Sequence, residues 1–203
     1  MSLAAVITAD IVNSTVPGTA MGKKLVARLS TVLKNYKFEF YRGDSFQAYV
    51  KDPSAALKLA IRLRTAAKSF SGIYDVRISI GIGKAARNVQ ALRTASSEAF
   101  ILSGRMFEQL KDDQRLWIQS ANENANIAFR VIAYFTDYIL KRLTSRQAEV
   151  VLELLKEQTQ TAVSQKLKIK QSTINKHAQS AGWAEIEKIL HEYNQMIIQF
   201  NPA

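Results

Sequence analysis

The sequence of 203 residues predicts an α+β protein, in which a β-sheet with its covering helices is followed by helices alone. Up to about residue 120, short apolar or alternating stretches of strand length are interleaved with amphipathic stretches of helical length. From residue 121 onward only helical periodicity remains. We therefore expect a sheet-containing domain over residues 1–120, a connecting helix over 121–142 and an all-helical domain over 143–203. The connecting helix is expected to pack on the sheet domain, and the alternative is that it pairs with its copy in a dimer.

The first strand is expected over residues 3–9, which are almost wholly apolar, as in a buried central strand. A polar turn leads into a helix at about 20–35, with its leucines on one face. Residues 36–41 and 45–50 alternate with the period of two of half-covered strands. The turn Arg42-Gly43-Asp44 joins them into a hairpin with Asp44 at its tip.

Pro53 stands at the favoured first turn of the next helix, which is expected to end near Phe70 and to carry Arg64 on its outer face. The alternating segment 75–82 is a fourth strand, followed by a helix beginning near 94–97 and a last strand at 115–119. The order strand, helix, strand, strand, helix, strand is the ferredoxin-like split unit. It predicts an antiparallel-centred sheet with helices on one face.

Asp10 and Asp44 each follow an apolar run of strand character. If their strands are neighbours, the two carboxylates lie side by side at one edge of the sheet. That arrangement suits a shared divalent cation, Mg²⁺ or Mn²⁺, carrying a nucleoside triphosphate. The plainer alternative is that aspartate is common at strand ends and turns because it binds nearby backbone amides.

Composition indicates which cellular location and which classes of partner to expect. The chain has no cysteine, which excludes disulfides and thiolate metal sites and favours a reducing, cytoplasmic location. Its N-terminal apolar stretch is too short for a membrane span, so no membrane partner is expected. The 28 basic residues exceed the 17 acidic ones, giving a net charge of +11. This excess favours a polyanionic partner such as nucleic acid or nucleotide, although solubility alone is an equally good explanation.

Residues 143–182 carry a pattern of three short helices. Thr144 or Ser145 caps the first helix, a second runs from about 160 to 167, and a turn at 168–170 leads into a third at 171–180. This pattern resembles the helix-turn-helix of sigma-factor region four and LuxR-like proteins, except that Lys168 stands where glycine is common.

In such a motif the third helix reads base edges of double-stranded DNA, and flanking cations meet phosphates. No acidic residue lies between Gln158 and Ala184. A plain helical bundle used for dimerisation is the alternative. The residues expected to contact DNA are Lys166, Lys168, Lys170, Gln171, Ser172, Thr173, Asn175, Lys176 and Gln179.

Four segments, ADIVNST, RGDSFQAYV, RISIGIG and EAFILSGRMFEQL, resemble in order the signature segments of class III nucleotidyl cyclase catalytic domains. The resemblance implies that Asp10 and Asp44 bind metal and that the amides of Ile11 and Val12 face the phosphates. It also implies that Arg105 stabilises charge on the transferred phosphate.

Three positions depart from the cyclase pattern. Ile101 replaces the asparagine that orients the ribose, while Phe40 and Thr94 replace the residues that select the base. Orientation of the substrate lowers the barrier of such a reaction by several kcal/mol, and that contribution is lost without the asparagine. We therefore do not expect an efficient cyclase.

The combination of a reduced cyclase-like region with a helix-turn-helix resembles the SatD family of small bacterial proteins over nearly the whole chain. The sequence therefore predicts a homodimeric, DNA-binding transcription regulator with a degenerate nucleotide-sensing domain. A two-metal nucleotidyl cyclase or related phosphoryl-transfer enzyme is the alternative, and an adaptor that binds protein through the same helices is a third.

Overall fold

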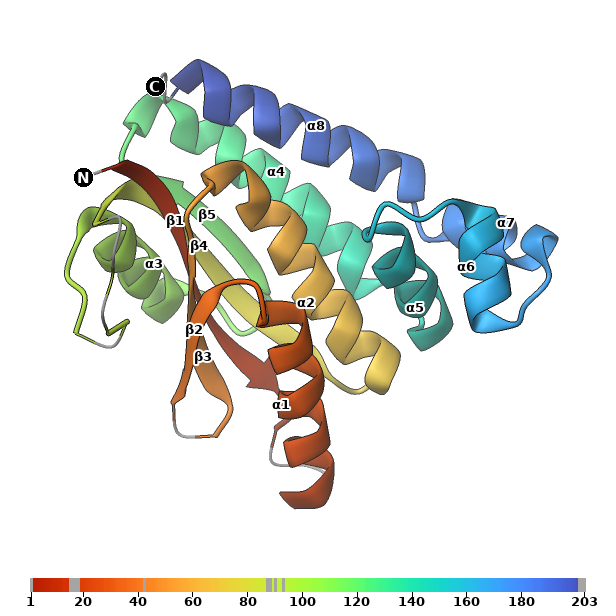
Figure 1. The fold of residues 1–203 in the computed structure, drawn as a ribbon. Helices are drawn as coiled ribbons and strands as arrows, with labels where there is room; N and C mark the ends of the chain where they lie inside the picture. Colours follow the sequence, from red (N-terminus) through yellow and green to blue (C-terminus); the bar gives the residue numbers. More distant parts are fainter. Residues whose placement is uncertain are drawn as a thin grey trace.

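A five-stranded mixed sheet lies at the centre of the structure, a computed structural model that describes residues 2–14, 19–41, 43–86, 89, 91–92 and 94–200 (Figure 1). The strand order is β2-β3-β1-β4-β5. The strands are β1 (Ser2–Val12), β2 (Lys37–Tyr41), β3 (Ser45–Val50), β4 (Asp75–Ala85) and β5 (Leu116–Ser120). The helices are α1 (Thr19–Leu33), α2 (Ala56–Phe70), α3 (Glu98–Gln109), α4 (Glu123–Lys141), α5 (Ser145–Leu154), α6 (Gln160–Leu167), α7 (Gln171–Ser180) and α8 (Trp183–Phe200), with a 3-10 turn, η1 (Pro53–Ala55), before α2.

The α+β class predicted from the sequence is confirmed. β1 pairs antiparallel with both β3 and β4, and β2 and β3 form the expected hairpin. β5 is parallel to β4, because α3 carries the chain back over the sheet between them. β1 also extends three residues beyond the expected end at Ala9, so Asp10 lies within a paired strand.

Both faces of the sheet are covered, and the expectation of helices on one face is wrong. Ala5 and Ile7 of β1 belong to the main core with α1, α2 and α4. Ala4 and Val6, which alternate with them, pack instead with Phe100 of α3 on the opposite face. Gly81 of β4 allows α3 to lie close to the sheet, since a Cβ at this position would lie 2.3 Å from the Ala99 carbonyl oxygen of α3.

A buried charged cluster joins α2, β4 and α4. The Arg64 guanidinium, fully buried, donates to both carboxylate oxygens of Asp75 at 2.9 and 2.7 Å and to Asp137 at 2.7 Å. The expectation that Arg64 lies on the outer face of its helix is therefore wrong. Asp137 also accepts from the Arg115 backbone amide at 2.9 Å and from Lys141 at 3.1 Å.

The C-terminal helices do not pack as a separate unit. The main core continues into Val151 of α5 and Ile186 of α8, and the buried Tyr193 hydroxyl donates to the Pro53 carbonyl at 2.9 Å. α5 begins with a capping box between Thr144 and Gln147, as the sequence predicted for Thr144. The main core therefore includes residues from all three predicted parts, and the boundaries at positions 120 and 142 stay a prediction. None of the described helices is long and apolar enough to cross a membrane.

Candidate functional site

The terminal lobe, which we define as α6, α7 and the outer face of α5, projects from the molecule beyond α5, beside the beginning of α8 (Figure 1). Its small core is distinct from the main core and contains Val150 and Leu154 of α5, Val163 of α6, and Ile174 and Ala178 of α7. Because α7 contributes only two fully buried side chains to this core, most of its surface stays open to solvent.

The turn between α6 and α7 is set by Lys168. This residue adopts the left-handed conformation, with φ 55° and ψ 43°, and its backbone amide donates to the carbonyls of Gln165 and Ser164. The Ser164 hydroxyl then donates to the Ile169 carbonyl at 2.8 Å. Left-handed backbone at a helix end is the reason that glycine is common there. The sequence placed the turn correctly despite the lysine.

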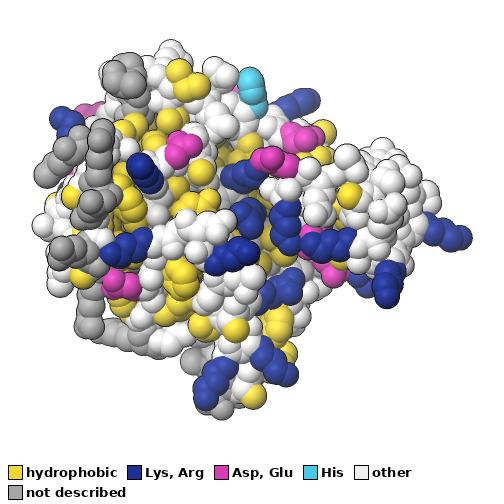
Figure 2. All heavy atoms as spheres, viewed as in Figure 1, with side chains coloured by type: hydrophobic (Ala, Val, Ile, Leu, Met, Phe, Trp, Pro, Cys, Tyr) yellow, Lys and Arg dark blue, Asp and Glu magenta, His cyan; other side chains and the backbone are white. Residues whose placement is uncertain are grey.

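Most of the polar side chains expected to contact DNA are open to solvent. Gln171, Ser172, Asn175, Lys176 and Gln179 of α7 are exposed, whereas Thr173 is half-buried. Lys166, Lys168 and Lys170 are also exposed. Figure 2 shows Lys and Arg side chains at the outer end and lower edge of this lobe, with uncharged atoms over most of its visible face.

Lys166 differs from the other cations of the lobe. Its ammonium group lies 2.7 Å from the Glu153 carboxylate of α5, which Lys156 also approaches to 2.8 Å. Partial burial would raise the pKa of Glu153, but the hydrogen bonds from the two lysines outweigh it and lower that pKa. Lys166 therefore holds α6 to α5, and it is the least available of the lysines for an external anion.

The sheet rim, defined by Asp10, Ser14, Asp44 and Arg77, is the second site. Asp10 lies opposite Ser45 in the pairing of β1 with β3, so it is next to Asp44. The Ile11 amide donates to the Asp44 carbonyl at 3.1 Å. The backbones of the two aspartates are thus adjacent, as the sequence predicted for neighbouring strands.

Each carboxylate of the rim already has a partner. Arg77, opposite Asp10 in β4, donates to its two oxygens through Nε at 3.3 Å and Nη2 at 2.7 Å. The same guanidinium lies 4.9 Å from the centre of the Phe107 ring of α3. Asp44 accepts from the Ser14 hydroxyl at 2.8 Å. Asp10 does not fit as a metal ligand in this arrangement, because a cation would have to displace Arg77, while Asp44 retains free lone pairs.

Two of the residues assigned from the cyclase resemblance, Ile11 and Arg105, are placed differently from what it implies. The Ile11 amide is used by the Asp44 carbonyl, and Val12 is the last residue of β1, opposite Asp75. Arg105 is exposed on α3, two positions beyond the buried Ser103, so it faces away from the sheet. It makes no ion pair with any residue that the structure describes. Arg77 is the arginine of the rim, and sequence reasoning missed it because it reads as one alternating position of a strand.

The described part of the chain holds no group of three or more acidic or histidine side chains that could bind a metal ion. A cavity of about 210 Å³ does adjoin the rim, lined by Ser14, Gly22, Asp44 and Tyr74 among others. The Tyr74 hydroxyl is buried there and has no hydrogen-bond partner among the described residues. This cavity is smaller than the roughly 300 Å³ at which small-molecule pockets begin, so it would admit only part of a nucleotide.

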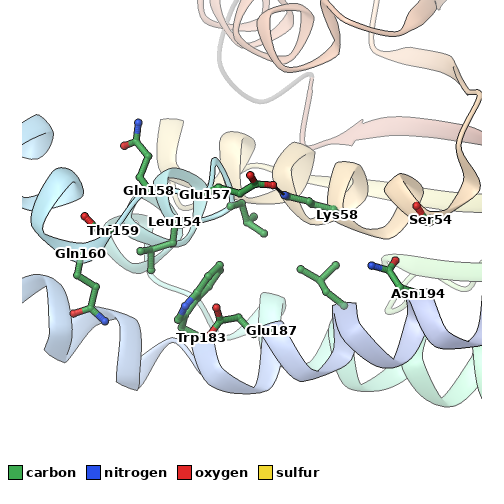
Figure 3. A pocket seen from close by; sticks show the side chains of 12 residues that line it. Ser54, Lys58, Leu154, Glu157, Gln158, Thr159, Gln160, Trp183, Glu187 and Asn194 are labelled. Atoms are coloured by element: carbon green, nitrogen blue, oxygen red, sulfur yellow. Dashed lines mark hydrogen bonds and ion pairs between the residues drawn. The ribbon is translucent and has the colours of Figure 1, made fainter.

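A larger groove, of about 590 Å³, borders the terminal lobe, between α2, α8 and the segment linking α5 to α6 (Figure 3). Leu154 and Trp183 point toward each other within it, and a dashed line marks the 2.8 Å ion pair between Lys58 and Glu157. It contains neither the rim aspartates nor the exposed side chains of α7.

Comparison with models of known protein families finds no match for this chain, and no curated protein matches it either. Function must therefore be argued from the two sites themselves.

Proposed function

We propose that this protein is a transcription regulator of the helix-turn-helix type that binds double-stranded DNA through α7. Its sheet-containing part, with a ferredoxin-like arrangement, would then act as a degenerate cyclase-like domain that binds a nucleotide without catalysing its conversion. The observation that carries the proposal is the surface of α7. A helix whose buried side chains are Ile174 and Ala178 presents Gln171, Asn175 and Gln179 to solvent.

Those three amide side chains follow one another at every fourth position, so they lie along one face of the helix. An α-helix fits the major groove of B-DNA, and asparagine and glutamine can bond bidentately to adenine there. Lys168 and Lys170 precede the first turn of α7, and Lys176 lies in the second turn of this helix. Exposed cations beside a groove-binding helix are suited to contact phosphates.

Binding of fluorescently labelled duplex DNA over a salt series tests this proposal, followed by selection of preferred sequences from a random pool. Lys176→Ala should weaken binding to all sequences alike and reduce the slope of log K against log salt by about 1. Asn175→Ala should instead relax the preference at one base pair, by about 1–3 kcal/mol.

Lys24→Ala is the matched control, because it removes an exposed lysine from α1, outside the terminal lobe. It should leave both the slope and the sequence preference unchanged. Equal losses in Lys24→Ala and Lys176→Ala would reduce the interaction to general attraction by a basic protein. No binding at low salt would overturn the proposal.

The nucleotide-binding part rests on the rim. Asp44 faces the small cavity with Tyr74, and Gly22 of the first helical turn lines the same space. We infer a binding role for Asp44, with Mg²⁺ or Mn²⁺ accompanying the nucleotide. A thermal-shift screen over nucleoside triphosphates with either cation should show a stabilised protein, and Asp44→Asn should abolish the shift while leaving DNA binding at low salt intact.

The adjacent backbones of Asp10 and Asp44 are the observation that favours a rival function, a two-metal phosphoryl transfer. The Asp10–Arg77 pair opposes it, since both oxygens of that carboxylate accept from the guanidinium. Cyclic nucleotide or pyrophosphate formed by the pure protein with manganese, and lost in Asp10→Ala, would establish the enzyme. Absence of product with a retained thermal shift would support the sensor.

A further inference from the structure

The exposed apolar surface of the described residues is concentrated on α4. Nine large apolar side chains are exposed, and five of them, more than half, belong to this one helix. The inner side of α4, including Phe129 and Leu140, packs on the sheet as expected for a covering helix. Its outer side would ordinarily be polar. The five residues are Ile127, Val131, Tyr134, Phe135 and Tyr138.

Four of these residues form what we call the α4 seam: Ile127, Val131, Tyr134 and Tyr138. Their spacing of four, three and four positions is that of alternate a and d positions in a coiled coil. Such a stripe packs against another helix, because a facing helix supplies the matching row of side chains.

The spacing of the seam residues is the same when it is counted from either end of the helix. Its midpoint falls between Ile132 and Ala133, and the exposed charges Glu123 and Arg142 lie equally far from that point at opposite ends. In an antiparallel pair of identical helices, Ile127 would meet Tyr138 of the second copy and Val131 would meet its Tyr134. Glu123 would meet the oppositely charged Arg142. A two-fold axis requires this self-complementarity.

A groove beside the seam extends the same surface. It lies between α4 and α8, has a volume of about 340 Å³, and is lined by Val131, Phe135, Ile139 and Ile189 with Glu185, Lys188 and Glu192 also bordering it. Phe135, which lines this groove, has 61% of its surface exposed. A second copy that covered the seam would therefore also contact α8, so that two helices of each copy would meet, as in a four-helix bundle.

We propose that a second copy of this chain covers the α4 seam, in an antiparallel homodimer whose two-fold axis passes near Ile132 and Ala133. The end charges and the reversal symmetry of the spacing commit this surface to self-association. The inference stands on α4 and α8 and is independent of DNA or nucleotide binding.

Sedimentation of the full chain over a concentration series reaching about 100 µM tests the dimer. We expect a species of twice the 22.7 kDa chain mass. Tyr134→Glu places a charge near the axis twice per dimer, so the dissociation constant should rise about 30-fold or more, the effect of a central interface residue. Ile73→Glu is the control, because Ile73 is similarly exposed but lies outside the seam, and it should leave the dimer unchanged.

A charge exchange tests the antiparallel direction. Glu123→Arg alone and Arg142→Glu alone should each weaken the dimer about three- to tenfold, as expected for exposed ion pairs. The double variant restores opposite charges at both ends of an antiparallel pair and should recover most of the loss. A wild-type chain that stays monomeric would overturn the proposal. So would a dimer indifferent to Tyr134→Glu, or charge reversals without recovery. Circular dichroism of each variant separates loss of association from loss of fold.

Discussion

Arg64→Met removes the only cation that bridges Asp75 and Asp137 within the buried cluster of the described residues. Methionine retains much of the side-chain length and fits an apolar surrounding. It leaves two carboxylates, 8% and 4% exposed as residues, without their shared partner. We expect a marked loss of folding free energy, because an uncompensated charge in a low-dielectric interior is strongly unfavourable.

The size of the loss follows from what remains around the acids. Asp75 keeps the Val76 amide at 2.8 Å and Lys68 at 3.8 Å. Asp137 keeps a backbone amide and Lys141. Breaking a buried pair costs about 3–5 kcal/mol, and these residual partners place Arg64→Met near the lower end. For a chain of this size, that loss lowers the melting temperature by about 6–12 °C.

The pH dependence of the stability loss in Arg64→Met gives the prediction a second test. Burial alone would raise the pKa of Asp75, but the Arg64 charge and hydrogen bonds outweigh it and lower the pKa below its ordinary value of 3.8. In the wild type, this stabilisation is present above pH 3.8 and is lost as the pH falls through the folded-state pKa. Without Arg64, burial dominates and the pKa of Asp75 is raised. The deficit of Arg64→Met should therefore shrink as the pH is lowered from 7 toward 4.

Urea unfolding of wild type and variant at several pH values measures both effects. Arg146→Met is the control, since it removes an exposed ion pair with Glu149 and should cost less than about 0.5 kcal/mol. A deficit for Arg64→Met no larger than that of the control, or one that grows on acidification, would refute the reasoning.

Three further changes test the packing and the turn. Gly81→Ala should lower stability by about 3 kcal/mol or more in thermal melts and loosen α3, because the new Cβ meets backbone of α3 at 2.3 Å; an unchanged melting temperature would contradict this contact. Tyr193→Phe should cost about 1–2 kcal/mol in urea unfolding, since the buried Pro53 carbonyl loses its donor; a neutral effect would mean that solvent reaches this carbonyl. Lys168→Gly should stabilise the fold by about 0.5–1 kcal/mol by relieving left-handed backbone, yet reduce the salt slope of DNA binding by about 1; an unchanged slope would exclude Lys168 from phosphate contact.

Local pattern in the sequence determined where most elements lie and which side of α7 is polar. A ten-residue helix with apolar side chains at Ile174 and Ala178 can turn little else inward, so exposure of Asn175 and Lys176 follows from helical periodicity. Two short alternating runs joined by a tight turn likewise predicted the hairpin of β2 and β3 that carries Asp44. These inferences depend on residues only a few positions apart.

Only the tertiary structure decided which distant side chains meet. Arg77 reaches Asp10 across 67 positions because β4 pairs with β1 in one register, whereas Arg105, assigned from a local motif, faces solvent. Arg64 looked like an outward cation until β4 and α4 closed over it with Asp75 and Asp137. Register and layer order arise from cooperative packing of the whole chain, and a single helix or strand carries no record of which neighbour will cover it.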